Sequence, residues 1–213
     1  MARCTAITGA TGHVGGNLVR ALLARGDSVR CLVHEDDRAI RGLDVERCEG
    51  DVRKSETLRP LLDGADRVFH LAAIISIDGD RGGLVQAVNI DGTRNVAIAA
   101  LDAGVRRFVH CCSVHAFDQA PLDEPVDETR LRATGPRHLA YDRSKAAGEA
   151  AVREVVARGL DAVIVHPSGV IGPYDFKRSR MGQVLLDLFR RKLVALVPGG
   201  SSKMAPGKIL MAE

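Results

Sequence analysis

The chain has 213 residues, of which 46% are hydrophobic and 27% charged, a composition typical of a globular domain and too polar for a membrane protein. Thirty basic residues nearly balance 27 acidic ones, and two tyrosines, five phenylalanines and no tryptophan leave few rings to stack on bases, so nucleic-acid binding is disfavoured. No apolar run approaches the ~20 residues of a transmembrane helix, and residues 1–7 hold no signal-like stretch, which predicts a cytoplasmic protein without a membrane partner.

Short apolar runs alternate with amphipathic stretches along the chain. Strands are predicted at 3–8, 28–33, 45–48, 66–72, 106–112 and 161–166, and helices at 13–25, 54–62, 84–103, 139–158 and 179–192. Gly26, Gly104 and Gly159 stand where a left-handed residue would end a helix. This βαβ alternation predicts an α/β fold, a doubly wound parallel sheet of the Rossmann type.

The first predicted strand-to-helix turn has the sequence TGATGHVGG, residues 8–16. Because a strand precedes it and an amphipathic helix follows, its glycines predict a dinucleotide-binding turn. Gly9 takes the unusual dihedrals, Gly12 lets the backbone approach a pyrophosphate, and Gly15 lets the helix pack closely on the sheet. The anion would lie at the positive end of the helix dipole.

Further motifs follow in chain order. They are Gly50-Asp51-Val52, His70-Leu71-Ala72-Ala73, Asn89-Ile90-Asp91-Gly92-Thr93, Ser113, Tyr141-Asp142-Arg143-Ser144-Lys145, and the run from His166 to Pro173. With the GxxGxxG turn, this set resembles the extended short-chain dehydrogenase/reductase superfamily, in particular its dihydroflavonol-reductase-like and epimerase-type members. The resemblance covers residues 3 to about 200.

Tyr141 and Lys145 are four residues apart on a predicted helix, so their side chains share one face. The ammonium is expected to lower the pKa of Tyr141 from about 10 toward the working pH, as a proton donor requires. Ser113 ends a central strand and is expected to hold the substrate oxygen. The resemblance adds Asn89, which would organise a water or the lysine. The alternatives are an ordinary Tyr/Lys pair, a strand-ending serine and an asparagine bonded to a neighbouring loop.

The resemblance also implies a set of cofactor-binding residues. These are Thr8, Gly9, Thr11, Gly12, His13, Val14, Gly15, His34, Arg38, Asp51, Val52, Leu71, Ala72, Ala73, Tyr141, Lys145, Pro167, Ser168 and Val170. Asp51 would contact the adenine, with a turn aspartate as the alternative. Pro167 would shape the nicotinamide pocket. The residue before it is His166, where many members have arginine, and a buried, hydrogen-bonded histidine is expected there.

The second predicted strand ends at Val33, where an acid that binds the ribose 2′-hydroxyl of NAD is expected and is missing. His34 and Arg38 would face a 2′-phosphate instead, so NADP is favoured. Glu35, Asp36 and Asp37 oppose this if they point inward, which leaves NAD as the alternative.

Five cysteines, at positions 4, 31, 48, 111 and 112, show no C-x-x-C spacing and predict reduced thiols. His110, Cys112 and His115 are of metal-ligating types. Strand alternation, however, places His110 and Cys112 on one face and Cys111 with Ser113 on the other, so no metal is predicted.

The prediction is a nicotinamide-dependent reductase or dehydrogenase that moves a hydride between the cofactor and a small-molecule carbonyl or secondary alcohol. Dehydration is disfavoured, because dehydratases of this superfamily carry Thr-Asp-Glu where this chain has Ser113-Val114-His115. The alternatives are a nucleotide-sugar epimerase that forms a transient keto intermediate and a non-catalytic cofactor-binding relative. A homodimer is left open.

The predicted organisation is a dinucleotide-binding domain over 1–175 and a remnant of a substrate-binding region over 176–213. Residues 114–138, rich in proline and acidic residues, predict a long loop, and 198–213 an irregular segment. Extended members of the superfamily continue further, so the resemblance implies that most of the substrate-binding part is missing.

Overall fold

The computed structural model describes residues 3–177, 179–190 and 210–211. Its main sheet has six parallel strands in the order β3-β2-β1-β4-β5-β6. The strands are β1 Cys4–Thr8, β2 Ser28–Val33, β3 Glu46–Glu49, β4 Arg67–His70, β5 Arg107–Cys111 and β6 Ala162–Val165. All six predicted strands and the doubly wound fold are confirmed.

The helices also follow the prediction. They are α1 His13–Ala24, α2 Arg59–Leu62, α3 Leu84–Gln86, α4 Thr93–Asp102, α5 Ala140–Val156 and α6 Arg180–Phe189. The helix predicted at 84–103 is divided, because a π-helical turn at Ala87–Gly92 separates α3 from α4. Gly26, Gly104 and Gly159 have the positive φ expected after a helix. Residues 191–192 of the last predicted helix lie outside the described residues.

Some short elements were not predicted. They are 3₁₀ turns at Arg38–Ile40 and Val114–Ala116 and a parallel pair of two-residue strands, β7 Val170–Ile171 and β8 Leu210–Met211. Within the helix predicted at 54–62, a 3₁₀ turn at Ser55–Thr57 precedes the shorter helix α2. Apart from β8, the segment predicted as irregular, 198–213, lies outside the described residues. The loop predicted at 114–138 is present after its opening 3₁₀ turn.

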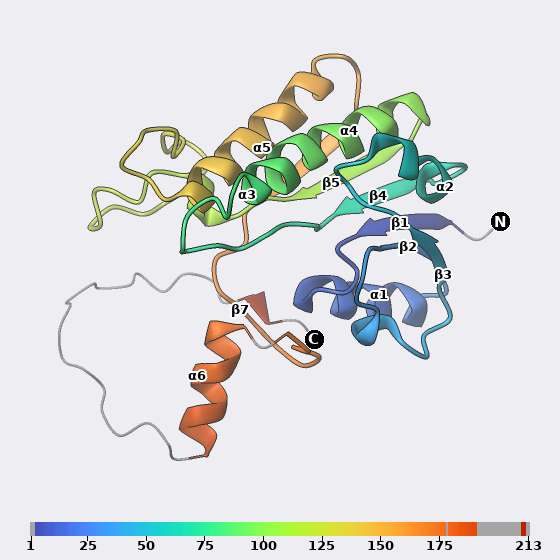
Figure 1. Ribbon diagram of the computed structural model, residues 1–213, viewed down its shortest axis with the longest axis horizontal. Coiled ribbons are helices and arrows are strands. Elements are labelled where there is room, and N and C mark those ends of the chain that lie inside the picture. Colours follow the sequence, from blue (N-terminus) through green and yellow to red (C-terminus); the bar gives the residue numbers. More distant parts are fainter. Residues whose placement is uncertain (1–2, 178, 191–209, 212–213) are drawn as a thin grey trace.

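Helices cover both faces of the sheet, as the apolar strands require. In Figure 1, α4 and α5 lie over one face and α1 over the other. The α4–α5 face packs around Phe108, Leu61 and Val152, and the α1 face around Ile7 and Val19, all with no exposed surface. β1 contributes to both clusters because Ala6 and Ile7 point to opposite faces.

The strand order reverses between β1 and β4, whose ends pair at Thr8 and His70. In open parallel sheets a ligand crevice forms outside the carboxyl ends of the strands at such a reversal. The glycine turn follows β1, and Ser113 lies two residues after β5 on the same edge. The fold therefore brings the two predicted halves of the site to one edge of the sheet.

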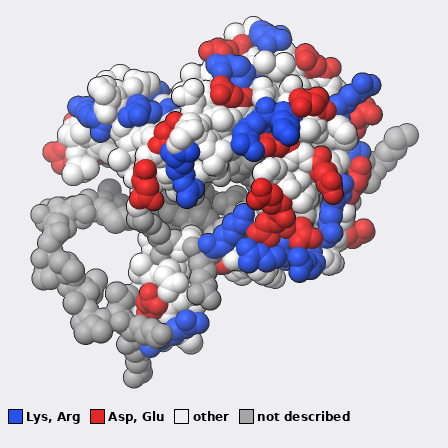
Figure 2. Space-filling model, viewed as in Figure 1, with Lys and Arg blue, Asp and Glu red and all other residues white. Residues whose placement is uncertain are grey.

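The surface is mixed in charge, and Figure 2 shows Lys and Arg interspersed with Asp and Glu over the visible face. All five cysteines are free, as predicted. Among the helices of the described residues, none combines the length and apolar character needed to span a membrane.

Candidate active site

The glycine turn after β1 is held by close backbone contacts. Gly9 has φ +74°, and a Cβ there would lie 2.5 Å from Ala72 N, at the end of β4. A Cβ on Gly15 would lie 2.1 Å from Gly9 O. Both positions therefore require glycine. The prediction for Gly15 is corrected in one respect, since the helix packs closely on its own turn rather than on the sheet.

Gly12 leaves open space beside the first turn of α1. Its φ of −82° is ordinary, and within the described part of the chain Gly9 O, at 3.3 Å, is the one atom near the position of a Cβ. The first turn of α1 holds no acidic residue and has no side-chain cap, so the N–H groups of His13, Val14 and Gly15 have no partners within the helix. This cradle suits an anionic phosphate group, which fits a dinucleotide.

The other residues expected to bind the cofactor near the glycine turn and after β4 and β6 range from fully buried to exposed. The Thr8 side chain is fully buried and its hydroxyl lies 2.7 Å from His70 Nδ1, so a cofactor contact by Thr8 would have to come from its backbone. Val14 is 36% exposed at the start of α1. His13 Nε2 lies 3.0 Å from Pro173 O, which joins the glycine turn to the segment after β6. Thr11, Leu71, Ala72 and Pro167 are partly exposed, and Ala73 and Ser168 are exposed. Val170 lies in β7.

Asp51 and Val52 follow β3 and are buried. Asp51 Oδ1 accepts a hydrogen bond from Arg53 N at 2.9 Å, and the Arg53 guanidinium binds both carboxylate oxygens. The hydrogen bonds from Arg53 hold the pKa of Asp51 below its ordinary value. Asp51 thus has the geometry of a turn aspartate, which was the alternative to adenine contact.

His34 and Arg38 are exposed near the carboxyl end of β2, and each has an acidic neighbour. His34 Nε2 lies 3.4 Å from Asp51 Oδ2. Arg38 binds Asp36 through two nitrogens, at 3.0 and 2.9 Å. Lys177 Nζ lies 3.6 Å from the same Asp36 carboxylate. Asp36, one of the three acids expected to oppose a 2′-phosphate, is therefore paired with two cations.

Ser113, Tyr141 and Lys145 come together at the carboxyl end of β5. Ser113 follows β5 in an extended conformation, and its Oγ accepts the His115 N–H at 3.2 Å. Tyr141 and Lys145 project from the first two turns of α5. Lys145 is 4% exposed, and its Nζ donates to Cys111 O at 2.9 Å. Tyr141 is thus hydrogen-bonded to Ser113, and the Lys145 ammonium is held at the end of the same strand.

The expected effect of Lys145 on Tyr141 is not found. Burial raises the pKa of the Tyr141 phenol above its ordinary value, and a hydrogen bond with Ser113 opposes that rise. Burial lowers the pKa of Lys145, whose ammonium is directed to a backbone carbonyl. In this structure the phenol is therefore held protonated by its surroundings rather than ionised by the lysine.

Asn89 lies in the π-helical turn and is buried. Its amide nitrogen donates to Ile74 O and to Ser144 Oγ, both at 2.9 Å, and its oxygen accepts Ile74 N–H at 2.8 Å. Ser144 Oγ in turn donates to Tyr141 O. The side chain therefore binds a neighbouring loop and the turn that carries Tyr141, and none of these bonds reaches Lys145.

His115 and Asp142 form a pair that the sequence pattern did not predict. His115 Nδ1 lies 3.3 Å from Asp142 Oδ1, and the His115 ring lies edge-on to Tyr141 with centroids 6.0 Å apart. Asp142 directly follows the predicted tyrosine and His115 stands two residues after the predicted serine. Their closeness in sequence to two predicted site residues is the feature from which this pair could have been predicted.

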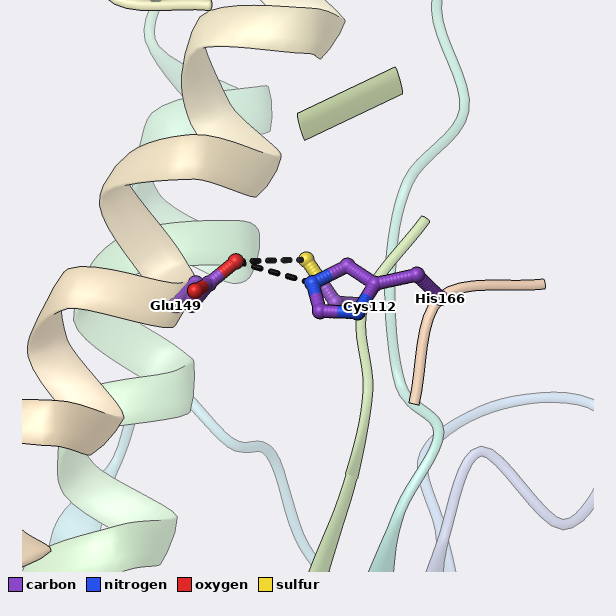
Figure 3. Close-up of side chains that lie close together, drawn as sticks. All are labelled: Cys112, Glu149 and His166. Atoms are coloured by element: carbon purple, nitrogen blue, oxygen red, sulfur yellow. Dashed lines mark hydrogen bonds and ion pairs between the residues drawn. The ribbon is translucent and has the colours of Figure 1, made fainter. Parts of the chain in front are cut away.

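Three potential metal ligands meet beside α5, but not the three first considered. Cys112, Glu149 and His166 have their ligand atoms within 4.8 Å of one another, and Figure 3 shows the carboxylate directed at the thiol and the imidazole. Burial raises the pKa of the Cys112 thiol to about 11, so it is neutral. Arg132 and Arg153 already bind the carboxylate, and their charges repel a cation.

His166 is hydrogen-bonded, as expected, and its side chain is 8% exposed, although the residue as a whole is only partly buried. Its partner Glu149 was missed, although it stands one helical turn after Lys145 on α5 and could have been found from that spacing. His110 is buried, and neither of its ring nitrogens has a hydrogen-bond partner among the described residues.

Comparison with known proteins adds a family and several relatives. The model of the NAD dependent epimerase/dehydratase family matches residues 5–204. Sterol demethylase protein B of Methylococcus capsulatus is 43% identical over 92% of this chain and 60% of its own length. The 4-hydroxy-2-methyl-3-oxo-4-farnesyl-3,4-dihydroquinoline-1-oxide ketoreductase of Stigmatella aurantiaca is 34% identical over 98% of this chain and 64% of its own length.

Several solved structures are also similar to this chain. The structure of gox2253 matches with a TM-score of 0.77 and 36% identity, over 88% of this chain and 57% of that one. The Bordetella bronchiseptica enzyme WbmH, in complex with NAD+, matches with a TM-score of 0.74 and 25% identity, over 90% of this chain and 64% of that one. The chain thus spans 57% to 64% of the lengths of these four proteins.

Proposed function

Because the chain belongs to the NAD dependent epimerase/dehydratase family, we propose that it is a nicotinamide-dependent oxidoreductase acting on a carbonyl or secondary alcohol. The observation that carries the proposal is the meeting of Ser113 and Tyr141 on the sheet edge that also holds the open cradle at Gly12. Relatives named as a ketoreductase and a cinnamoyl-CoA reductase support reduction as the reaction type.

In this proposal the bound nicotinamide supplies or accepts the hydride. Tyr141 donates its phenolic proton to the oxygen of a carbonyl substrate, and its hydrogen bond with Ser113 opposes the rise in pKa that burial causes and that would make the phenol a weaker acid. The Ser113 hydroxyl holds the same oxygen as negative charge develops on it. Lys145 orients the ribose of the cofactor, and the N-terminal turn of α1 binds its phosphates.

We propose NADP as the preferred cofactor. Val33 ends β2 without a carboxylate to bind a 2′-hydroxyl, and the pairing of Asp36 with Arg38 and Lys177 removes much of the repulsion toward a 2′-phosphate. Arg38 and His34 are both exposed there. NAD is the alternative, and direct comparison of NADPH with NADH in the same assay separates the two.

The test is oxidation of NADPH by the purified chain with a panel of aldehydes and ketones, including a sterol ketone because of the relative named for sterol demethylation. The matched variant is Tyr141→Phe, which keeps the ring and loses the proton donor. We expect its turnover to fall by about 10²- to 10⁴-fold while NADPH still binds. Equal turnover in the two proteins would contradict the role of Tyr141.

Epimerisation through a transient keto intermediate is the second candidate, because it uses the same three side chains and structures named as epimerases share this fold. It predicts a cofactor that stays bound through purification and no net NADPH oxidation. Binding of NADPH without turnover of any compound would instead favour the non-catalytic alternative.

A further inference from the structure

Glu149 is the centre of a buried network beside the proposed active site. It is 1% exposed, and its Oε1 accepts hydrogen bonds from Arg132 Nη2 at 2.7 Å and Arg153 Nε at 2.8 Å. Its Oε2 accepts from His166 Nε2 at 2.9 Å. Burial alone would raise the pKa of Glu149, but the bonds from His166, Arg132 and Arg153 hold it well below the ordinary value. The carboxylate is therefore charged and fully engaged.

The network joins three elements that carry site residues. Glu149 and Lys145 are one turn apart on α5. Cys112, next to Ser113, has its Sγ 3.5 Å from Lys145 O and 4.0 Å from Glu149 Oε2. Figure 3 shows the Glu149 carboxylate between α5 and the ends of β5 and β6. A change at this carboxylate would therefore alter the packing of α5 against the ends of β5 and β6.

Strand geometry explains how a buried contact reaches the site. The parallel ladder of β5 and β6 continues past both strands, with Cys112 N bonded to Val165 O and Val114 N bonded to Pro167 O. Side chains alternate along extended chain, so where Cys112 and His166 face Glu149, the next residues, Ser113 and Pro167, are turned away from it. The residues that contact Glu149 are therefore the direct neighbours of Ser113 and Pro167, which border the proposed site.

The Phe117 ring packs against two members of the network, His166 and Arg132. Phe117 lies with its ring centroid 4.6 Å from that of His166, and the Arg132 guanidinium carbon lies 4.2 Å from the Phe117 centroid. Phe117 is 2% exposed. His166 is therefore packed on one side and hydrogen-bonded on the other, and its ring has little freedom to move.

We propose that Glu149 and His166 are positioning residues, which fix the carboxyl end of β6 against α5 and so set the place of Pro167 relative to Ser113 and Lys145. This role rests on the proposed function, in which Pro167 borders the nicotinamide. The adenine and phosphate part of the cofactor is bound at the other half of the sheet edge. The network should therefore affect nicotinamide placement and leave the remainder of the binding site unchanged.

Three variants separate positioning from general stability. His166→Leu removes the donor, and His166→Asn removes it with a polar side chain too short to reach Glu149. His166→Gln keeps a nitrogen donor near the position of Nε2. Arg153→Ala is the matched control, because it removes another donor to Glu149 from a side chain that is 60% exposed and has no link to β5 or β6.

The measurement is titration with NADPH, followed by the emission of its nicotinamide, beside titration with 2′-phospho-ADP-ribose, which lacks that ring. We expect His166→Leu and His166→Asn to weaken NADPH binding by about tenfold relative to 2′-phospho-ADP-ribose and to shift the emission toward that of free NADPH. His166→Gln and Arg153→Ala should retain the ratio and the emission of the unaltered chain.

Four other results would overturn the positioning role or the proposed function. An unchanged ratio and emission in His166→Leu or, if that variant does not fold, in His166→Asn would overturn the positioning role. A change in Arg153→Ala as large as in His166→Leu would also overturn it, because the effect would then follow the charge on Glu149 and not the link to β6. If the unaltered chain binds 2′-phospho-ADP-ribose but not NADPH, positioning of the nicotinamide is refuted while the dinucleotide cradle stands. If it binds neither of these and also fails to bind NADH and ADP-ribose, the proposed function itself fails.

Discussion

At the scale of single residues, His70 makes the folded chain sensitive to acid. Its ring is fully buried, with Nδ1 2.7 Å from Thr8 Oγ1 and Nε2 2.9 Å from Thr93 Oγ1. Burial lowers the pKa of His70 to about 3. An unfolded histidine takes up a proton below pH ~6.5, so the stability that neutral His70 gives is complete above that pH and is lost as the pH falls toward 3. The expected loss for this group is about 1.4 kcal/mol per pH unit.

The measurement is the free energy of unfolding by urea at several pH values between neutral and mildly acidic, for the unaltered chain and His70→Gln. The variant should be less stable at neutral pH by about 1–3 kcal/mol, because buried hydroxyls lose a partner. Its free energy of unfolding should then fall less steeply as the pH decreases, with a slope that is smaller by about 1.4 kcal/mol per pH unit. Burial also lowers the pKa of His110, which contributes the same slope to both proteins. Parallel pH profiles for the two proteins would contradict the assignment.

The positions of the candidate site residues were predictable at this scale, whereas their electrostatics were not. Ser113 after β5 and Tyr141 with Lys145 on α5 follow from local spacing, and the structure brings them together. The protonation of Tyr141 and Lys145 depends on burial and on partners distant in sequence, such as Cys111 O, which lies 34 residues from Lys145. Local sequence carries little information about such contacts.

At the scale of elements, the predicted helix over 84–103 shows where periodicity stops being informative. Its extent was correct, but the π-helical turn at Ala87–Gly92 divides it. In that turn Asn89 bonds across to Ile74 and Ser144, and a Cβ on Gly148 of α5 would lie 2.4 Å from Asn89 O. The apolar pattern predicts a helix, whereas the extra residue in this turn depends on contacts with α5 and the loop after β4.

The close approach of the π-helical turn and α5 predicts the effect of Gly148→Ala. Alanine normally stabilises a helix interior by about 1 kcal/mol relative to glycine. Here the added methyl meets a backbone carbonyl that cannot rotate away, so we expect a net loss of about 1–3 kcal/mol in the free energy of unfolding. Gly169→Ala is the control, because among the described residues nothing lies within 4 Å of its Cβ, and a change within about 0.5 kcal/mol is expected. Chemical denaturation measures both, and a Gly148→Ala protein as stable as the parent would exclude the steric account.

At the scale of the whole molecule, the sheet has an edge that the sequence did not reveal. The apolar run in β6 predicts a strand buried on both faces, yet Val163 is 40% and Val165 42% exposed, while Ile164 packs on the α4–α5 core. Local pattern shows that a strand forms, but its burial depends on which elements pack on each face. Two faces of one strand can therefore differ although their residues are equally apolar.

Ligand binding at the sheet edge should stabilise the molecule as a unit, because the proposed site draws on β1 with α1 and also on β4, β5 and β6. For a ligand at 100 times its Kd, linkage predicts about 2.7 kcal/mol, or roughly 5–10 °C in Tm for a domain of this size. Gly12→Val is the sharpest test, since the backbone there has φ −82° and, among the described residues, a Cβ would meet one atom, Gly9 O at 3.3 Å. The larger side chain should lower the Tm of the ligand-free chain by a few degrees, because Gly12 is the N-cap of α1 and its Cβ would press on Gly9 O, and it should fill the cradle that the phosphates need. We therefore expect NADPH to raise the Tm of the parent and not of Gly12→Val, as measured by thermal unfolding with and without NADPH. An equal rise in both proteins would place the dinucleotide elsewhere, because a valine in the cradle and a pyrophosphate cannot share the same space.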